Sequence, residues 1–415
     1  MIELNKYKLG DLGFFFGGVT SIKKEDYGHG TPFLPYKNVY KNSKVNINEL
    51  ELMNVRPLDL DRRSGVYGDI FFTASSETPD EVAMSSVLLD EVENLTYNGF
   101  CKRFRLNDFE TLLPEYARYL FRDISFRREV YNLATGDIRF NISQESLANI
   151  EIEIPDLPTQ KQIAQILSSL DDKIELNLQM NQTLEAMAQV IFKEWFVNFN
   201  FPGFDGELVD GLPKGWRLGV LGELVDKLSK GTTPTQKDLG SLEVEIPFLK
   251  VKDISDNGSI IKSNLELIPS EVHQNQLKRS ILETDDILFS IAGTIGRVAI
   301  LDDSLNNSNC NQAIAFVRLK DKAKLLEFVH QWLKNDTVQN NIKSSIVQGV
   351  QANVSLTVLS NIEIIIPDDS TLHHWNSLIK PIYSRLLTNT YQIEYLTQTR
   401  DTLLPKLMSG QLEVV

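Results

Sequence analysis

A heptad pattern of apolar positions runs through residues 163–191. Its members are separated alternately by four and three residues, which is the spacing that places side chains along one seam of a paired helix. The seam consists of Ile163, Leu167, Leu170, Ile174, Asn177, Asn181, Leu184, Ala188 and Ile191. We therefore predict a helix over residues 158–198, which at about 1.5 Å per residue would be about 60 Å long.

A second seam with the same spacing lies 212 residues further along the chain. Asn177 maps onto Asn389, so each seam carries a polar position, which costs stability but fixes register and orientation. Because both helices follow related segments, we expect them to pair with each other and to run antiparallel. The residues that we expect to pair are Leu167, Leu170, Ile174, Asn177, Leu184, Ile379, Ile382, Leu386, Asn389, Ile393 and Leu396.

The segments before the two seams are also related. Residues 149–155 alternate apolar and polar side chains up to a proline, as a half-buried strand does, and return as residues 361–367. Residues 69–73 return in the same way as residues 286–290. A period of this length is far beyond the roughly 20–50 residues of a solenoid, so it indicates a duplicated domain followed by a helix.

These patterns predict an α+β fold, in which two long antiparallel coiled-coil helices separate two pseudo-symmetric mixed α/β domains. In the first domain, Pro114 suits a first helical turn, and the residues after it predict one helix running toward Gly136. The predicted parts are a first domain at residues 1–156, a central helical spacer at 157–200, a second domain at 201–367 and a C-terminal helical spacer at 368–415.

Composition narrows the class of protein. Hydrophobic and charged contents of 42% and 24% are ordinary for a soluble globular chain, and no apolar run approaches the roughly 20 residues that span a bilayer. Two cysteines, Cys101 and Cys310, favour buried free thiols and a cytoplasmic location. The net charge of −14 argues against binding nucleic acid through bulk charge, but it leaves room for a locally basic reading face.

Several segments carry a resemblance to a known family. The helical segments 157–164, 167–177, 184–188 and 192–197, together with the closing stretch 402–410, resemble the conserved regions of type I restriction–modification specificity subunits. The segments 68–75, 292–297 and 311–313 are similar to recurring parts of that family's target recognition domains. The second helical region departs from the pattern, because Leu372-His373-His374-Trp375 stands where a Gln-Lys-Gln-Ile type of start is expected.

The resemblance implies a non-catalytic DNA recognition subunit. Each of its two target recognition domains would read one half of a bipartite double-stranded DNA target, and the helices would set the gap between the halves. The implied partners are two methyltransferase subunits and two restriction/translocase subunits. The chain itself would hold no cofactor, because S-adenosylmethionine, ATP and Mg are expected on those partners.

Motifs for catalysis are weak or missing. Pro155-Asp156 followed by Asp171-Asp172-Lys173 matches the form of a metal-nuclease pattern, but its second part lies inside the heptad seam. Neither a Gly-Lys-Ser/Thr phosphate loop nor the Pro-Pro tetrapeptide of an adenine methyltransferase occurs in the sequence. The pair His373-His374 has no further ligands at metal spacing. We therefore expect no catalytic and no metal site.

Candidates for DNA contact are side chains that can reach base edges or phosphates. In the first domain they are Lys37, Ser75, Ser76, Thr78, Arg103, Arg105 and Arg139, with Arg118, Arg122, Arg127 and Arg128 as either a phosphate-facing stripe or a solvated helix face. In the second domain they are Lys250, Lys252, Thr294, Arg297, Gln348 and Gln351.

Two other functions remain open at this point. A coiled-coil interaction scaffold without a DNA role would explain the seams and the acidity, but not the duplicated domains. A self-sufficient restriction enzyme is disfavoured by the missing motifs.

Overall fold

The computed structural model describes residues 3–20, 22–136, 139–235, 243–347 and 353–414. It forms two compact units: unit 1 consists of Met1–Leu178 with Tyr391–Val415, and unit 2 consists of Gln179–Thr390. The two longest helices, α7 (Leu157–Phe196) and α14 (Asp369–Met408), each contribute one half to each unit. The four-part division expected from the sequence stays a prediction, because the compact units divide both helices.

A four-stranded antiparallel sheet with the order β2-β9-β5-β7 forms the centre of unit 1. A three-stranded sheet has the order β4-β3-β8, in which β3 and β8 are parallel. The strands are β2 (Gly13–Gly17), β9 (Cys101–Leu106), β5 (Ile70–Thr73), β7 (Ser85–Val87), β4 (Glu51–Met53), β3 (Tyr27–Leu34) and β8 (Thr96–Tyr97).

The core of unit 1 lies between the four-stranded sheet and two helices, α4 (Pro114–Leu120) and α5 (Ile124–Leu133). Phe72 of β5 meets the ring of Phe121 with 5.1 Å between centroids, and Phe121 in turn meets Phe126 of α5 at 4.9 Å. Such edge-to-face contacts add to the stabilisation from apolar burial.

The single helix that the sequence predicts from Pro114 toward Gly136 is therefore two helices. The break has a local cause, because the Asp123 carboxylate accepts a hydrogen bond from the Ser125 backbone nitrogen at 2.8 Å. This contact caps the first turn of α5 and makes Asp123 a helix start rather than a helix interior.

Unit 2 repeats the strand order of unit 1. Its four-stranded sheet has the order β15-β21-β18-β19, and its three-stranded sheet has the order β17-β16-β20 with β16 and β20 parallel. Helix α11 (Lys322–Lys334) packs against β19 and β21 and is followed by α12 (Asp336–Val347). The strands are β15 (Val225–Lys230), β21 (Ile314–Leu319), β18 (Ile287–Ser290), β19 (Val298–Ile300), β17 (Glu266–Pro269), β16 (Val244–Leu249) and β20 (Asn309–Cys310).

Around these sheets, the elements that open and close each unit recur at an offset of 212 residues. In unit 1 the opening strand pairs antiparallel with the strand that precedes α7, and in unit 2 the equivalent strands pair before α14. The duplication that the sequence predicts is therefore present in the elements themselves. The matched elements are β1 (Asn5–Lys8) with β14 (Arg217–Val220), α1 (Leu9–Leu12) with α8 (Leu221–Leu224), α6 (Gln144–Ala148) with α13 (Leu356–Ser360), and β11 (Glu151–Ile154) with β22 (Glu363–Ile366).

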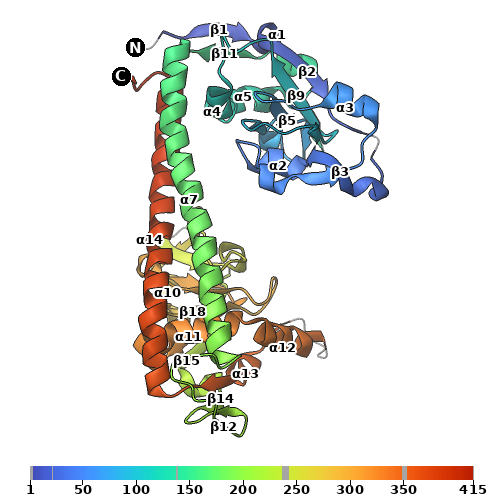
Figure 1. Ribbon diagram of the computed structural model, residues 1–415. Coiled ribbons are helices and arrows are strands. Elements are labelled where there is room, and N and C mark those ends of the chain that lie inside the picture. Colours follow the sequence, from blue (N-terminus) through green and yellow to red (C-terminus); the bar gives the residue numbers. More distant parts are fainter. Residues whose placement is uncertain (1–2, 21, 137–138, 236–242, 348–352, 415) are drawn as a thin grey trace. The chain divides into compact units, whose positions relative to one another are not determined.

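Helices α7 and α14 lie antiparallel within each unit (Figure 1). In unit 1, Asp171 of α7 meets Arg400 of α14, and six residues later Asn177 donates to Gln392 at 3.1 Å. Residue numbers thus rise along one helix as they fall along its neighbour. In unit 2, Asn389 donates to the Asn181 side-chain oxygen at 2.9 Å. The antiparallel coiled-coil pairing and the α+β class follow the sequence prediction.

The side chains expected to pair differ in how far the helix pair buries them. Asn177 and Asn389 are fully buried, and each has a side-chain oxygen without a hydrogen-bond partner. Leu167 and Ile379 are also fully buried. The remaining seam side chains, which are partly buried, are Leu170, Ile174, Leu184, Ile382, Leu386, Ile393 and Leu396.

The two units take different side chains from the helices into their cores. Unit 1 uses aliphatic residues near the end of α14, including Leu407 and Met408. Unit 2 uses aromatic residues, and Trp375 of α14 lies 5.0 Å from the ring of Phe196 of α7. Cys101 and Cys310 are free and buried. Among the described helices, none has an apolar stretch long enough to cross a membrane.

Candidate nucleic-acid interface

A pocket opens in unit 1 where the central strand β5 leaves the sheet. The connection from β5 to β7, residues 74–84, contains the short strand β6 (Ser75–Ser76), which pairs antiparallel with β10 (Phe140–Asn141). This pairing brings Arg139, which directly precedes β10, beside the connection. The pocket, of about 420 Å³, is lined by Tyr36, Tyr40, Ser75, Ser76, Glu77, Glu81, Phe100 and Arg139.

Helix α2 (Tyr36–Lys41) forms one wall of this unit 1 pocket and is hydrogen-bonded to the 74–84 connection. The Tyr36 hydroxyl donates to the Ser75 carbonyl oxygen at 2.7 Å, and the Tyr40 hydroxyl donates to Glu81 Oε1 at 2.6 Å. Ser76 Oγ donates to the other carboxylate oxygen at 2.8 Å. These two hydroxyl donors lower the pKa of Glu81 and keep it ionised.

Three of the DNA-contact candidates, Ser75, Ser76 and Arg139, thus lie together in one pocket. Lys37 is exposed on α2, and Thr78 is exposed within the 74–84 connection. Tyr36, Tyr40, Glu81 and Phe100 were not among the residues predicted from the sequence. No local signal points to them, because Tyr40 and Glu81 lie 41 positions apart and meet only where helix α2 packs against β5 and β7.

Arg122 and Arg127 are candidates for a phosphate-facing stripe, but they bind backbone within unit 1. Arg122 donates to the carbonyl oxygens of Val39 and Tyr40 at 3.0 and 3.2 Å, at the end of α2. Burial lowers the pKa of Arg122 to about 10. Arg127 donates to the carbonyl oxygens of Asp80 and Val82, both at 2.6 Å. These two arginines therefore hold the walls of the unit 1 pocket, while Arg128 remains exposed.

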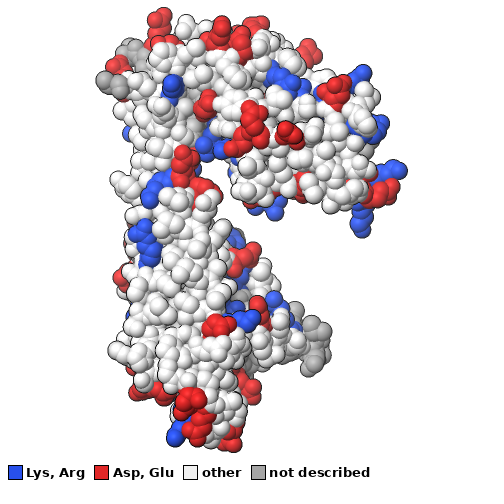
Figure 2. Space-filling view, viewed as in Figure 1, with Lys and Arg blue, Asp and Glu red and all other residues white. Residues whose placement is uncertain are grey.

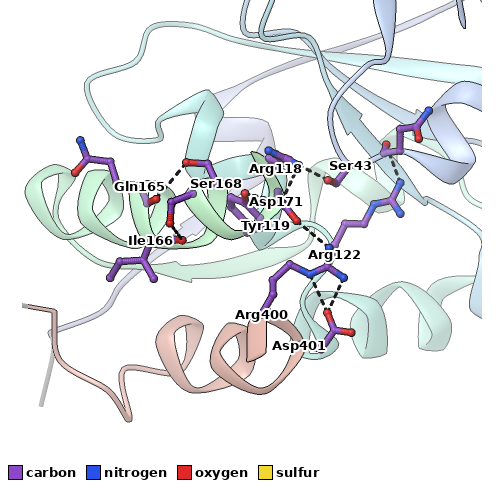
Figure 3. A network of polar contacts seen from close by, with 12 residues as sticks. Ser43, Arg118, Tyr119, Arg122, Gln165, Ile166, Ser168, Asp171, Arg400 and Asp401 are labelled. Atoms are coloured by element: carbon purple, nitrogen blue, oxygen red, sulfur yellow. Dashed lines mark hydrogen bonds and ion pairs between the residues drawn. The ribbon is translucent and has the colours of Figure 1, made fainter. Parts of the chain in front are cut away.

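Arg118, the third candidate of that stripe, lies at the junction between the domain and the long helices. It forms an ion pair with Asp171 of α7 at 2.7 Å, and Arg400 of α14 pairs with the same carboxylate at 2.8 Å. Tyr119 also donates its hydroxyl to Asp171 at 2.8 Å. Figure 3 shows these groups converging on Asp171, so Arg118 joins the domain to the helix pair.

Arg103 and Arg105 of β9 are also engaged inside unit 1. Arg103 is only 4% exposed and donates to the Ser64 carbonyl oxygen. Arg105 donates to both carboxylate oxygens of the fully buried Asp69, at 2.7 and 2.6 Å, and these bonds raise the pKa of Arg105. These contacts give both arginines a structural role within unit 1, and contact of either one with DNA stays a prediction.

The Asp69–Arg105 pair has a counterpart in unit 2 that was not predicted from the sequence. Asp286 precedes β18 as Asp69 precedes β5, and Arg318 of β21 donates to both of its carboxylate oxygens at 2.8 and 2.7 Å. Asp286 is fully buried as well. Both units therefore use the same bidentate ion pair to join the start of the central strand to its neighbour.

In unit 2 the candidate cations are largely paired with carboxylates. The Nζ atoms of Lys250 and Lys252 lie 2.5 and 3.6 Å from Oε1 of Glu266. The hydrogen bond from Lys250 lowers the pKa of Glu266. Arg297 pairs with Asp256 at 2.6 Å. Thr294 is exposed in the β18 to β19 connection. Gln348 and Gln351 lie outside the described residues.

The two units differ in the connection that comes after the central strand. In unit 1 the longer connection, residues 74–84, presents the Glu81 carboxylate, which α2 holds through Tyr40. In unit 2 the shorter connection, residues 291–297, ends at the Arg297 guanidinium, which also donates to the carbonyl oxygens of Val251 and Ile254. The connections after the central strands of the two units therefore carry different charged side chains, Glu81 in unit 1 and Arg297 in unit 2.

The nuclease-like pattern is not assembled in the described structure. Asp156 accepts a hydrogen bond from the Thr159 backbone nitrogen at 3.1 Å and caps the start of α7. Asp171 is occupied by the arginines at the helix junction. His373 and His374 are both exposed, and among the described residues no group of three His, Cys, Asp or Glu side chains could hold a metal ion.

Charge is mixed over the surface. Figure 2 shows Lys and Arg side chains interspersed with Asp and Glu on the face in view. With a net charge of −14, affinity for phosphates has to come from local basic groups or from bound partners rather than from bulk charge.

Comparison with known proteins gives a consistent result. A family model described as the type I restriction modification DNA specificity domain matches residues 1–186 and again residues 213–399. The MjaIX specificity subunit of a type I restriction enzyme from Methanocaldococcus jannaschii is 26% identical over 419 residues, covering 98% of this chain and 93% of the relative. The HindI specificity subunit from Haemophilus influenzae is 27% identical over 65% of this chain and 71% of its own length.

The fold is also found among solved structures. The crystal structure of the S subunit of a type I restriction-modification system from M. genitalium matches with a TM-score of 0.60 and 16% identity. The match covers 98% of this chain and 96% of that one.

Proposed function

The chain belongs to the type I restriction–modification DNA specificity family, and on this premise we propose that it reads a bipartite DNA target with one unit per half-site. Membership makes it a non-catalytic specificity subunit of a type I complex. The coiled-coil scaffold is not favoured, because the family model matches both copies of the duplicated domain.

The duplicated scaffold, with different charged side chains in the connection after the central strand, is the observation that supports this proposal best. Both units have the same strand order and the same buried ion pair, yet the connection after the central strand presents Glu81 in one and Arg297 in the other. Two units that share a scaffold but carry different side chains in this connection are suited to recognising two different DNA sequences. Specific readout depends on the donors and acceptors offered to base edges.

The proposed complex contains two methyltransferase subunits and two restriction/translocase subunits, and it works in the cytoplasm. S-adenosylmethionine, ATP and Mg would bind to those partners. Within each unit, helices α7 and α14 offer apolar groups for docking, because several large apolar side chains on them are exposed. These side chains are Leu176, Leu178, Met187 and Val190 of α7 and Leu378, Leu387 and Tyr395 of α14.

The division of labour can be tested by exchanging residues 1–155 for those of another family member. The hybrid is co-expressed with the cognate methyltransferase subunits, and methylated adenines are mapped across the genome. One half of the methylated sequence should change, and the other half should stay as in the parent. A change in both halves, or in neither, would contradict one unit per half-site.

A gel-shift assay with and without the methyltransferase subunits separates this function from that of a scaffold. Specific retardation of DNA carrying the mapped target is expected for the complex. A complex that methylates nothing and retards no DNA would reject the proposed function itself.

A further inference from the structure

We propose that Glu81 is a base-reading side chain of unit 1, and that its carboxylate accepts a hydrogen bond from the exocyclic N4 amine of a cytosine in the major groove. This assignment rests on the proposed function. It adds what that function leaves open, namely a named residue and the base that it reads.

The Glu81 carboxylate has free acceptor capacity. A carboxylate offers about four acceptor positions. The hydroxyls of Tyr40 and Ser76 take two of them, and the Thr78 side chain contributes a weaker third hydrogen bond. The described Lys and Arg side chains form no ion pair with this carboxylate. About one position therefore remains for a donor that enters the unit 1 pocket.

The same carboxylate is held in place. Arg127 donates to the backbone carbonyl oxygens on both sides of Glu81, those of Asp80 and Val82. Arg122 fixes the end of α2, which carries Tyr40. A recognition group whose position is set before binding loses little conformational freedom when the ligand arrives.

The charge of Glu81 limits the kind of donor that it can meet on DNA. A fixed negative charge close to DNA is repelled by the phosphates, so it can remain there only if it meets a hydrogen-bond donor on a base. In the major groove cytosine presents its N4 amine as a donor without an adjacent acceptor, which suits a carboxylate, whereas adenine presents a donor beside an acceptor and suits an amide. Carboxylate chemistry therefore selects cytosine.

The rest of the pocket fits a pyrimidine next to a backbone. Phe100, at the pocket, is 59% exposed and offers an apolar surface to the carbon edge of the base. Arg139 lines the same pocket and can reach a phosphate. Together they supply the apolar contact and the positive charge that Glu81 lacks.

Unit 2 provides an internal comparison. At the equivalent connection it carries Arg297, whose guanidinium is paired with Asp256. A guanidinium cannot accept a hydrogen bond from a cytosine amine. The proposed preference therefore belongs to the unit 1 half-site alone.

The test uses the full complex with its cognate methyltransferase subunits and maps methylated adenines genome-wide for the parent and for Glu81→Gln. The amide loses the charge and one acceptor oxygen. We expect about a 10- to 100-fold loss of discrimination at one C·G position of one half-site, which is the range for a single direct base contact. The other half-site should be unchanged.

A matched control is Glu115→Gln. Glu115 is an exposed carboxylate of unit 1 that also accepts a hydrogen bond from a tyrosine hydroxyl, that of Tyr67 at 2.5 Å, but it lies outside the pocket. Its substitution removes the same charge and should leave the methylated sequence as it is in the parent.

Tyr40→Phe is a second variant, which keeps the carboxylate and removes one group that holds it. A weaker relaxation at the same C·G position is expected, and this variant decides the matter if Glu81→Gln does not assemble into a complex. The inference is overturned if Glu81→Gln methylates the parental sequence unchanged, if it alters a position that is not C·G, or if it alters both half-sites. None of these outcomes would contradict the proposed function, as long as the parent complex methylates a bipartite sequence.

Discussion

At the scale of single residues, the arginines of unit 1 divide into those that build the protein and those that remain available to a ligand. Arg105, Arg122 and Arg127 all bind protein groups, whereas Arg139 lines the pocket. In the sequence they look alike, because no pattern of neighbours distinguishes a guanidinium bound to a carbonyl oxygen from one in solvent. That is why the sequence could name candidate arginines but could not tell which of them bind protein groups.

The structural role of Arg105 leads to a prediction about stability. Arg105→Gln leaves the fully buried Asp69 without its cation, and breaking a buried pair in this way costs about 3–5 kcal/mol. Since the Arg105 side chain is 28% exposed, we expect the lower end, about 3 kcal/mol, in urea unfolding. The methylated sequence should be unchanged in the fraction that folds. Arg139→Gln is the control, because an exposed substitution of this kind changes stability by less than about 0.5 kcal/mol.

A finding of normal stability for Arg105→Gln together with a changed half-site would contradict this division. That result would indicate that Arg105 contacts DNA.

At the scale of elements, periodicity predicted what is local and repeated. The heptad spacing predicted both long helices and placed Asn177 and Asn389 in the seams, where both are fully buried. It could not predict the parallel contact between β3 and β8, because that pairing joins residues about 60 positions apart, such as Phe33 and Thr96. Nor did it predict the break at Asp123, where one capping carboxylate outweighs the helical pattern around it.

The antiparallel pairing of α7 and α14 can be checked by cross-linking within unit 1. Cysteines at Asn177 and Gln392 replace two side chains that are hydrogen-bonded at 3.1 Å, and a short bifunctional reagent should join them in high yield. In the control, the second cysteine replaces Thr402 instead of Gln392. This position lies ten residues further along α14, about 15 Å away, so no cross-linked product is expected. Efficient linking of the Thr402 pair with none at Gln392 would contradict the antiparallel register.

At the scale of the whole molecule, the chain combines two readers with helices that belong to both units. With a net charge of −14, the attraction for phosphate has to come from local basic groups or from partner subunits. In the proposed function the helices set the number of unread base pairs between the half-sites, since a fixed protein length corresponds to a fixed DNA spacing. This role can be tested with insertions near Asn177.

Four inserted residues add about 6 Å and rotate the rest of the helix by only about 40°, whereas two residues rotate it by about 200°. Because 6 Å is close to two base-pair steps of about 3.4 Å, the four-residue variant should keep both half-sites and lengthen the gap by about one or two base pairs. The two-residue variant should lose methylation, because it turns one reader away from the DNA. Genome-wide mapping of methylated adenines measures the gap in each variant. An unchanged gap in the four-residue variant would show that the helices do not set the distance between the half-sites.

The end of α14 completes the core of unit 1, and this has a consequence for a shorter gene. Unit 1 completes its core with Leu403, Leu404, Leu407 and Met408 of α14, and the residues 212 positions earlier are Ile191, Phe192, Trp195 and Phe196, all apolar. A gene that stopped after α7 would encode one domain and one long helix. In a dimer of that product, the end of α7 from one copy could take the place of the end of α14 in the core of the other copy. We expect such a half-length gene to give a dimer close in mass to the intact chain, with methylation of a target identical to its reverse complement. Light scattering that found only a monomer of half the mass would contradict this.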